Sequence, residues 1–393
     1  MRIGIASPIS IQKFSNYLYP ESVINASSLL GLKAPAVDTL VEFFLQDNHS
    51  VSIYTLSFEV DKRVILCGPK LKIIINPLRK SALKRALDLF EIEAKLIFES
   101  INSEIPKPDI LHAHWTYEYA KGVVGFRKSI PTVITIRDWA PRIVQLYPNY
   151  YRLSRLILNN RILRMDSISY IANSEYISQK LKEKWQLEPV FIPNPINNEF
   201  LTSKCKTVRE SSLLISVSNS LGKGKNIEKL LHAFRLVLRE FPKARLLLVG
   251  SLFVKDNKQI KLWRGRNLLT NVILQGYIDH NALIDLYDKA SIMVHPSLEE
   301  SFGNTILEAM ARKTNIIGGK NSGAVPFLLG KGDYGIICNI QSVDSIKNSI
   351  LKLLRDEHLR LELSEKAHKS VWENYTQQKI GEKHINLYET LLR

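Results

Sequence analysis

Short apolar runs alternate along the chain with stretches in which apolar residues recur at three- and four-residue spacing. The stretch 230–237, with Leu230, Leu231, Phe234 and Val237, shows the second pattern and predicts an amphipathic helix. This alternation predicts an α/β fold in which helices cover parallel sheets. The runs expected to form strands are 2–6, 50–55, 71–75, 110–113, 132–136, 169–172, 190–192, 213–217, 245–249, 272–274, 291–294, 316–318 and 335–338.

The length of 393 residues favours two domains, because a single hydrophobic core rarely grows to that size. The best boundary is the polar stretch 193–211, which begins with a Pro-Asn-Pro turn and ends just before a new strand pattern. We therefore expect one domain over 1–200, a second over 201–372, and a terminal segment over 373–393. The apolar spacing of 371–393 predicts a single helix.

The net charge of +16 is the unusual feature of the composition. Both halves carry an excess of cations, which suits phosphorylated substrates, an anionic membrane surface or nucleic acid, and equally suits a solvated basic surface. The three cysteines form neither a disulfide framework nor a zinc-ligand spacing, which favours a reducing, cytoplasmic setting. No stretch is apolar enough for a spanning helix, so we expect a soluble or peripheral protein.

The stretch 295–311 carries the densest candidate chemistry. It follows an apolar strand, turns at Pro296 and opens a helix near Gly303. A helix N-terminus presents unpaired amides and the positive end of a dipole, which suits a diphosphate. Glu300 precedes this helix and Glu308 lies within it, so one could accept hydrogen bonds from sugar hydroxyls and the other from a ribose. The alternative is an ordinary strand-turn-helix with solvated glutamates.

A second candidate is the loop 218–226, which follows a strand and contains Lys223 and Lys225. Lysines in a flexible loop before a helix can hold phosphate oxygens without a metal. A solvated loop is the alternative.

Together these two stretches resemble the retaining family-4 glycosyltransferases of GT-B fold, in which two glutamates, one before and one within a helix, are separated by seven residues. The resemblance implies two Rossmann-like domains that face each other across a cleft, with the last helix crossing back to the first domain. It implies that Glu300 is catalytic and faces the donor sugar. The donor-binding residues that it implies are Ser220, Lys223, Lys225, Tyr277, Phe302, Gly303, Asn304, Thr305 and Glu308. Ser220 stands where the family usually has an arginine, and Lys223 could supply the missing charge.

Residues of the first half are candidates for the acceptor side. His112 and His114 point the same way from one strand, so a metal site is conceivable, although no third ligand motif supports it. The family commonly has such a pair in the acceptor pocket, and we expect that role, with Gly31 in the long loop 7–35 also contributing. Arg137 replaces a histidine that many relatives place near the donor sugar. It cannot act as a base, but it can hold a phosphate or sugar oxygen, and we assign it to the catalytic group.

The chain contains no Asp-x-Asp motif, so the resemblance implies a transferase that needs neither metal nor cofactor, with the nucleotide sugar as co-substrate. It also implies front-face chemistry, in which the phosphate of the donor helps to deprotonate the acceptor hydroxyl.

Two basic amphipathic stretches, 77–87 and 151–165, could lie on anionic lipid on the inner face of the plasma membrane. Their leucines could instead face the domain core. Lipid contact would suit a lipid-linked saccharide acceptor for a surface polysaccharide. Alternatives to this transferase are a nucleotide-sugar epimerase of the same fold and a non-catalytic nucleotide-sugar-binding subunit. Nucleic acid is not an expected partner, because no recognition module accompanies the basic residues.

Overall fold

The computed structural model describes residues 1–205 and 207–393, which divide into two compact units. The N-terminal unit comprises Met1–Asn197 together with Gln377–Arg393, and the C-terminal unit comprises Asn198–Thr376. The chain thus passes from one unit to the other inside the polar stretch 193–211. Lys206 of that stretch lies outside the described residues.

The N-terminal unit is built on one sheet with the strand order β3-β4-β2-β1-β5-β6-β7-β8. Neighbouring strands are parallel except at the edge, where β3 runs antiparallel to β4. The strands are β1 (Arg2–Ala6), β2 (Ser50–Ser57), β3 (Val64–Cys67), β4 (Leu71–Pro77), β5 (Ile110–His114), β6 (Thr132–Ile136), β7 (Ser169–Ala172) and β8 (Val190–Phe191).

Helices cover both faces of this sheet, because successive side chains of a strand point to opposite faces. Ile3 and Ile5 join one buried cluster, whereas Leu111 and Ala113 join the other. The helices are η1 (Ile11–Tyr17), α1 (Pro20–Ala26), α2 (Pro35–Gln46), α3 (Ala82–Leu87), α4 (Glu91–Asn102), α5 (Glu118–Val123), η2 (Val124–Phe126), α6 (Ala140–Leu146), α7 (Tyr150–Ile162), α8 (Glu175–Trp185) and α17 (Gln377–Leu392).

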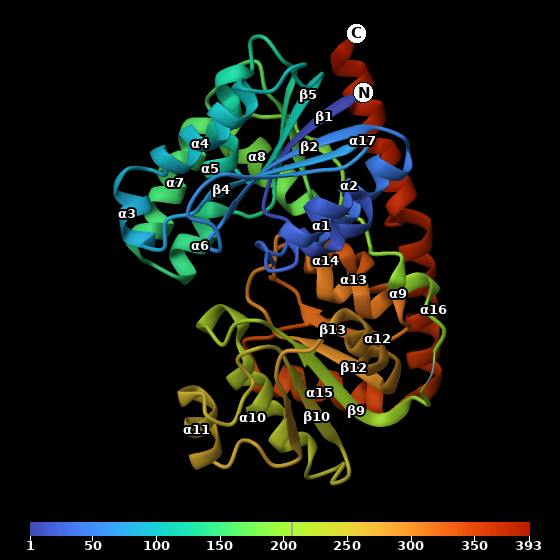
Figure 1. Ribbon diagram of the computed structural model, residues 1–393. Coiled ribbons are helices and arrows are strands. Elements are labelled where there is room, and N and C mark those ends of the chain that lie inside the picture. Colours follow the sequence, from blue (N-terminus) through green and yellow to red (C-terminus); the bar gives the residue numbers. More distant parts are fainter. Residues whose placement is uncertain (206) are drawn as a thin grey trace. The chain divides into compact units, whose positions relative to one another are not determined.

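The last helix, α17, belongs to the N-terminal unit and runs beside α2 (Figure 1). Gln377 donates a side-chain hydrogen bond of 2.9 Å to the carbonyl of Thr39 at the start of this contact. Gly381 lies so close to the ring of Phe43 that a Cβ would come within 2.1 Å of it. The glycine therefore allows the two helices to pack closely.

The C-terminal unit has a fully parallel sheet with the order β11-β10-β9-β12-β13-β14, the arrangement of a doubly wound nucleotide-binding fold. The strands are β9 (Glu210–Val217), β10 (Arg245–Val249), β11 (Val272–Gln275), β12 (Ala290–His295), β13 (Asn315–Gly319) and β14 (Ile336–Cys338). The helices are α9 (Glu199–Thr202), η3 (Lys223–Lys225), α10 (Ile227–Val237), α11 (Lys258–Gly265), α12 (His280–Lys289), α13 (Asn304–Ala311), α14 (Val325–Leu328), η4 (Gly330–Gly332), α15 (Val343–Arg355) and α16 (Glu357–Asn374).

Every strand expected from the sequence is present, but three expectations need correction. The edge strand β3 was not predicted. The expected loop 7–35 contains the helices η1 and α1. The single helix expected over 371–393 is two helices, because α16 ends at Asn374 and α17 begins at Gln377. In the described residues, no helix is both long enough and apolar enough to cross a bilayer.

Candidate active site

The candidate site of the C-terminal unit lies where the strand order reverses. From β9 the chain proceeds toward one edge of the sheet, and from β12 it proceeds toward the other, so the loops after these two neighbours diverge. Open α/β sheets bind their ligands in the crevice that such a divergence leaves at the carboxyl ends of the strands. The loops 218–226 and 296–303, both singled out from the sequence, leave the sheet at this point.

Gly303 joins the loop after β12 to α13. Its φ of 105° lies in a region that favours glycine, and it precedes the helix without a side-chain cap. The first turn of α13 therefore has no capping side chain on the amides that an α-helix leaves unpaired. Phe302, beside it, is buried and packs edge-to-face on Tyr375 at 6.1 Å. These contacts hold the helix start in a fixed place.

Glu300 is held by two basic side chains. Its Oε1 lies 2.5 Å from the Nζ of Lys225 and 3.2 Å from the Nε2 of His295. Burial alone would raise the pKa of Glu300, but Lys225 and His295 outweigh burial and hold that pKa well below its usual range. Glu300 is therefore an ionised carboxylate over the physiological range of pH.

The loop that carries Lys225 is tied to the loop that carries Glu300. The amide of Leu298 donates a hydrogen bond of 2.7 Å to the carbonyl of Gly224. Ser220 shapes the same loop, since its hydroxyl accepts a hydrogen bond of 3.1 Å from the amide of Gly222. Lys223 is exposed. Ser220, which stands where the family usually has an arginine, thus supports the loop backbone, and Lys223 offers a positive charge in the same loop.

Glu308 lies in α13, where its side chain is 9% exposed. The hydroxyl of Tyr287 donates a hydrogen bond of 3.3 Å to its Oε2, and the same hydroxyl lies 3.3 Å from the carbonyl of Thr305. Burial raises the pKa of Glu308 to about 8, although the bond from Tyr287 opposes the shift. Glu308 is therefore largely protonated at pH 7, in contrast to Glu300.

This difference gives a prediction for Glu308→Gln. Unfolded glutamate titrates near 4.5 and folded Glu308 near 8, so the wild type loses stability as pH rises between these values. Glutamine has no such loss. The stability advantage of the variant should grow from pH 5 to pH 8 and exceed about 1 kcal/mol at pH 8. Thermal unfolding across this range measures it, with the exposed Glu357→Gln as control. A difference that does not change with pH would contradict the raised pKa.

The remaining donor-side residues occupy less central positions. Tyr277 follows β11 at the far edge of the sheet and is 63% exposed. Asn304 and Thr305 form the first turn of α13 and are partly exposed. The turn at Gly323 holds the backbone of Glu300, since the amide of Ala324 donates a hydrogen bond of 2.8 Å to the carbonyl of Glu300.

In the N-terminal unit, polar side chains gather at the carboxyl ends of β5 and β6. Arg137 follows β6, and its Nε and Nη2 each lie 3.1 Å from the Nδ1 of His114. Its Nη1 donates a hydrogen bond of 2.6 Å to the Oδ1 of Asn194. The guanidinium also lies over the ring of Trp115, 5.6 Å from its centre. Burial lowers the pKa of Arg137 to about 9, so the side chain stays cationic at neutral pH.

Two further residues expected on the acceptor side, His112 and Gly31, are in close contact with other parts of the same unit. The two ring nitrogens of His112 contact the hydroxyls of Tyr388 at 2.5 Å and Thr135 at 2.7 Å. Burial, together with the neighbouring His384 and Arg137, lowers the pKa of His112 well below its ordinary value. Gly31 has a φ of 72°, and a Cβ there would come within 2.4 Å of a backbone oxygen. Among the described residues, no three His, Cys, Asp or Glu side chains are grouped as a metal site requires.

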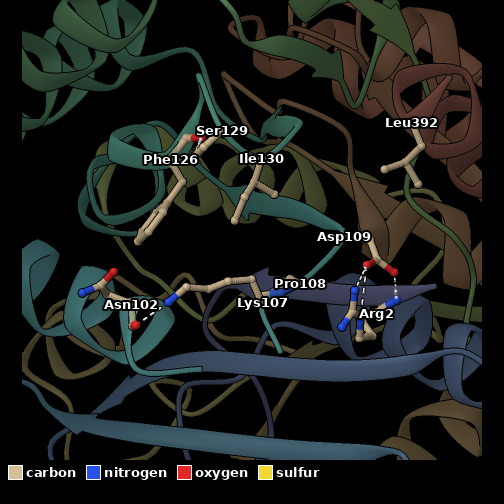
Figure 2. Close-up of a pocket in the computed structure, with 9 residues that line it drawn as sticks. All are labelled: Arg2, Asn102, Lys107, Pro108, Asp109, Phe126, Ser129, Ile130 and Leu392. Carbon is tan, nitrogen blue, oxygen red and sulfur yellow. Dashed lines mark hydrogen bonds and ion pairs between the residues drawn. The ribbon is translucent and has the colours of Figure 1, made fainter. Parts of the chain in front are cut away.

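A pocket of about 700 Å³ opens at the opposite, amino edge of the N-terminal sheet (Figure 2). Its charged groups are engaged with the protein. Arg2 pairs with Asp109, its backbone amide donating a 2.8 Å hydrogen bond to that carboxylate, and Lys107 donates one of 3.2 Å to the carbonyl of Ile101. Ligands of α/β sheets bind at the carboxyl edge, so this pocket is a less suitable active site.

Sequence reasoning missed several partners of the site residues. His295 stands within the recognised stretch, and its place at the end of a strand could have indicated a partner for Glu300. Tyr287 and Asn194 gave no such signal, because only the fold brings them to Glu308 and Arg137.

Two Rossmann-like units in one chain define the GT-B class of glycosyltransferases. The sequence model described as Glycosyltransferase Family 4 matches residues 36–200, and the one described as Glycosyl transferases group 1 matches residues 202–370. The chain belongs to this group 1, or family 4, of glycosyltransferases.

Curated relatives are similar over part of their length. The chain is 27% identical to N-acetyl-alpha-D-glucosaminyl L-malate synthase of Bacillus anthracis, over 72% of this chain and 75% of that protein. It is 25% identical to the capsular polysaccharide biosynthesis glycosyltransferase CapM of Staphylococcus aureus, over 50% of this chain and 51% of that one. The chain thus spans about half the length of CapM.

Solved structures share the whole fold at low identity. Sucrose-phosphate synthase from Thermosynechococcus elongatus superposes with a TM-score of 0.76 at 19% identity, over 100% of this chain and 99% of that one. Anabaena Alr3699/HepE, solved in complex with UDP and glucose, gives a TM-score of 0.70 at 14% identity, over 99% and 100% of the two chains.

Proposed function

We propose that this glycosyltransferase moves a sugar from a nucleotide diphosphate sugar to a saccharide acceptor, with retention of configuration. The observation that carries the proposal is the contact between Lys225 and Glu300 at the point where the strand order of a Rossmann-like sheet reverses. A cation and an ionised carboxylate beside a helix start suit a phosphate joined to a sugar. The complex of Anabaena Alr3699/HepE with UDP and glucose supports a donor of this kind.

In this proposal, different donor-side residues bind the phosphates, the sugar and the ribose of the donor. An ammonium group has three N–H donors, so Lys225 can keep its bond to Glu300 and also bind a phosphate oxygen. Lys223 and the N-terminus of α13 add positive charge. Glu300 accepts hydrogen bonds from sugar hydroxyls, and Glu308 binds the ribose.

The transfer proceeds without a metal or a protein nucleophile in this account. The bond between the anomeric carbon and the phosphate oxygen breaks, and the new bond to the acceptor oxygen forms on the same face. The proton of the acceptor hydroxyl passes to the departing phosphate. Lys225, Lys223 and the helix start stabilise the negative charge that develops on the nucleoside diphosphate.

A thermal-shift panel of nucleotides and nucleotide sugars tests the proposal. The correct donor should stabilise the wild type by about 2.7 kcal/mol at a hundredfold excess over its dissociation constant, and should stabilise Lys225→Met much less. Transfer should then require an acceptor. Binding of no nucleotide, or release of a new nucleotide sugar without acceptor, would contradict a transferase; the second result would indicate an epimerase.

We further propose that the acceptor is lipid-linked and that the N-terminal unit meets an anionic membrane surface. The helices α3 and α7 pack side by side. The core-facing alternative holds for part of this pair, since Leu158 and Ile162 of α7 are buried in the core. The pair also exposes apolar side chains, with Leu87 at 69%. The exposed apolar residues of this helix pair are Leu83, Leu87, Tyr150, Leu153 and Ile157. The names of relatives in capsular and lipopolysaccharide biosynthesis support such an acceptor.

The cations of these helices fall into two groups. Arg79 pairs with Glu93, Arg155 pairs with Glu118, and Arg85 is buried, so these three are not available to lipid. Among the described residues, the others have no carboxylate partner: Lys80, Lys84, Arg152, Arg161 and Arg164. They remain available to lipid phosphates.

Replacing Lys80, Lys84 and Arg152 by glutamine should therefore weaken binding to vesicles that contain anionic lipid. Each cation near such a surface contributes about 1 kcal/mol, so the affinity should fall by roughly two orders of magnitude. Co-sedimentation with vesicles of phosphatidylcholine and phosphatidylglycerol measures it. A control triple variant at Lys128, Lys243 and Lys352, all exposed, should bind like the wild type. Equal loss in both variants would show that only net charge matters.

A further inference from the structure

Four polar side chains stand in a row at the carboxyl edge of the N-terminal sheet. His114 ends β5 and Arg137 follows β6, whose residue Thr135 is paired with His114. Asn173 follows β7, whose last residue is paired with Ile136, so Asn173 stands beside Arg137. Asn194 follows β8 and is bonded to Arg137. Neighbouring parallel strands thus bring these residues together at the edge where such sheets bind ligands.

Arg137 is a buried cation that is only 8% exposed. Its hydrogen bonds go to a neutral imidazole and a neutral amide, and within the described residues it forms no ion pair with a carboxylate. Of the other buried arginines, Arg312 is paired with Asp288, whereas Arg85 lies over the rings of Phe58 and Tyr151 and, in the described residues, also forms no ion pair. The partly buried Arg155 is paired with Glu118. Burying a charge without a counter-ion is costly.

Neighbouring groups leave further hydrogen-bonding capacity unused. Because Arg137 donates to the Nδ1 of His114, the proton of this neutral ring must sit on Nε2. That Nε2 is buried and has no partner in the described part of the chain, and neither has the Oδ1 of Asn173. A guanidinium also has more N–H groups than the three bonds of Arg137 use. These unused groups suit a ligand that carries both a negative charge and a hydroxyl.

We infer that the row of His114, Arg137, Asn173 and Asn194 binds a carboxylate or phosphate group carried by a saccharide substrate. The inference rests on the proposed transferase function and specifies further that one of the two saccharide substrates is negatively charged. Arg137 supplies the counter-ion, His114 Nε2–H donates to an anionic oxygen, and Asn173 accepts from a sugar hydroxyl. The anionic group belongs either to the transferred sugar, as in a uronic acid, or to the acceptor, as in a sugar phosphate.

The first test measures stability without any sugar. Removing an uncompensated buried cation should stabilise the fold, so Arg137→Met should raise the melting temperature. The matched variant Arg155→Met should lower it, because that change leaves the buried Glu118 unpaired. Inorganic phosphate, added to protein saturated with nucleotide, should raise the melting temperature of the wild type and leave that of Arg137→Met unchanged. A fall for Arg137→Met like that for Arg155→Met would overturn the inference.

The second test compares charged and neutral sugars in calorimetric titrations. The probes are UDP-glucuronate against UDP-glucose, GDP-mannuronate against GDP-mannose, and glucose 6-phosphate against glucose with the nucleotide bound. The wild type should prefer one charged partner at least tenfold, Arg137→Met should lose that preference, and Arg137→Lys should keep part of it. A preference for the charged member of either nucleotide-sugar pair would place the anionic group on the donor sugar. A preference for glucose 6-phosphate over glucose would place it on the acceptor.

Two outcomes of the second test would overturn the inference. One is nucleotide binding with no preference for any charged sugar. The other is an equal loss of affinity for UDP or GDP alone in Arg137→Met, which would assign the arginine to the leaving diphosphate. Failure of the transferase proposal itself looks different, because the wild type would then bind no nucleotide and Lys225→Met would change nothing.

Discussion

Replacing Glu300 by glutamine should lower kcat/KM for sugar transfer by roughly 10²- to 10³-fold. Glutamine has nearly the same shape, but it is neutral, and an uncharged acceptor binds sugar hydroxyls less strongly than a carboxylate does. It also leaves Lys225 without the charge that it contacts at 2.5 Å. Initial rates of nucleoside diphosphate release, with the donor found in the thermal-shift panel, measure the effect.

The control for this variant is Glu357→Gln, which removes an exposed carboxylate of the same unit. Glu357→Gln should keep the melting temperature of the wild type, whereas Glu300→Gln should melt somewhat lower but remain folded, because it removes the carboxylate that Lys225 and His295 contact. Transfer by Glu300→Gln at the wild-type rate, with nucleotide still bound, would favour a non-catalytic nucleotide-sugar-binding subunit.

The variant Lys225→Met should show a loss of similar size, for a complementary reason. The diphosphate loses a cation that stabilises it as it departs, which costs roughly 10²- to 10³-fold in kcat. Donor affinity should fall as well, because the phosphates of the bound donor use the same charge. Calorimetric titration and initial rates separate the two effects. Lys229→Met, an exposed lysine one helical turn further along, is the matched control and should change neither.

Combining the two changes tests whether Lys225 and Glu300 act as a pair. Groups in direct contact are not independent, so the double variant should lose little more than either single variant. Losses that multiply would mean that the two side chains contribute separately, and the ion pair would then have no role in donor binding.

Much of the fold could be predicted because its strands are short, continuous apolar runs bounded by turns. Such runs are typical of strands buried on both faces, and β1, β6, β7 and β10 fall at the expected residues. The edge strand β3 is different, since Ile65 is exposed and the run is only four residues long. The final helix breaks after Asn374 although its apolar spacing continues, because the chain there leaves one compact unit for the other.

The candidate site was harder to predict than the fold. The spacing of Glu300 and Glu308 indicated a sugar-nucleotide site, but it could not indicate opposite protonation states. The ionised state of Glu300 depends on Lys225 and His295, which the sheet topology brings into contact with it. The protonated state of Glu308 depends on its burial, which the bond from Tyr287 only partly opposes. The same holds for Arg137. Its sequence position suggested an anion ligand, yet only the structure reveals that it is buried without a carboxylate partner.

A crystal structure of the wild type with its donor tests the central claim most directly. The account predicts that the diphosphate lies at the N-terminus of α13, within hydrogen-bonding distance of the Nζ of Lys225. It predicts also that a hydroxyl of the sugar contacts the carboxylate of Glu300. A nucleotide bound instead at the amino edge of the N-terminal sheet, in the pocket beside Arg2 and Lys107, would contradict it.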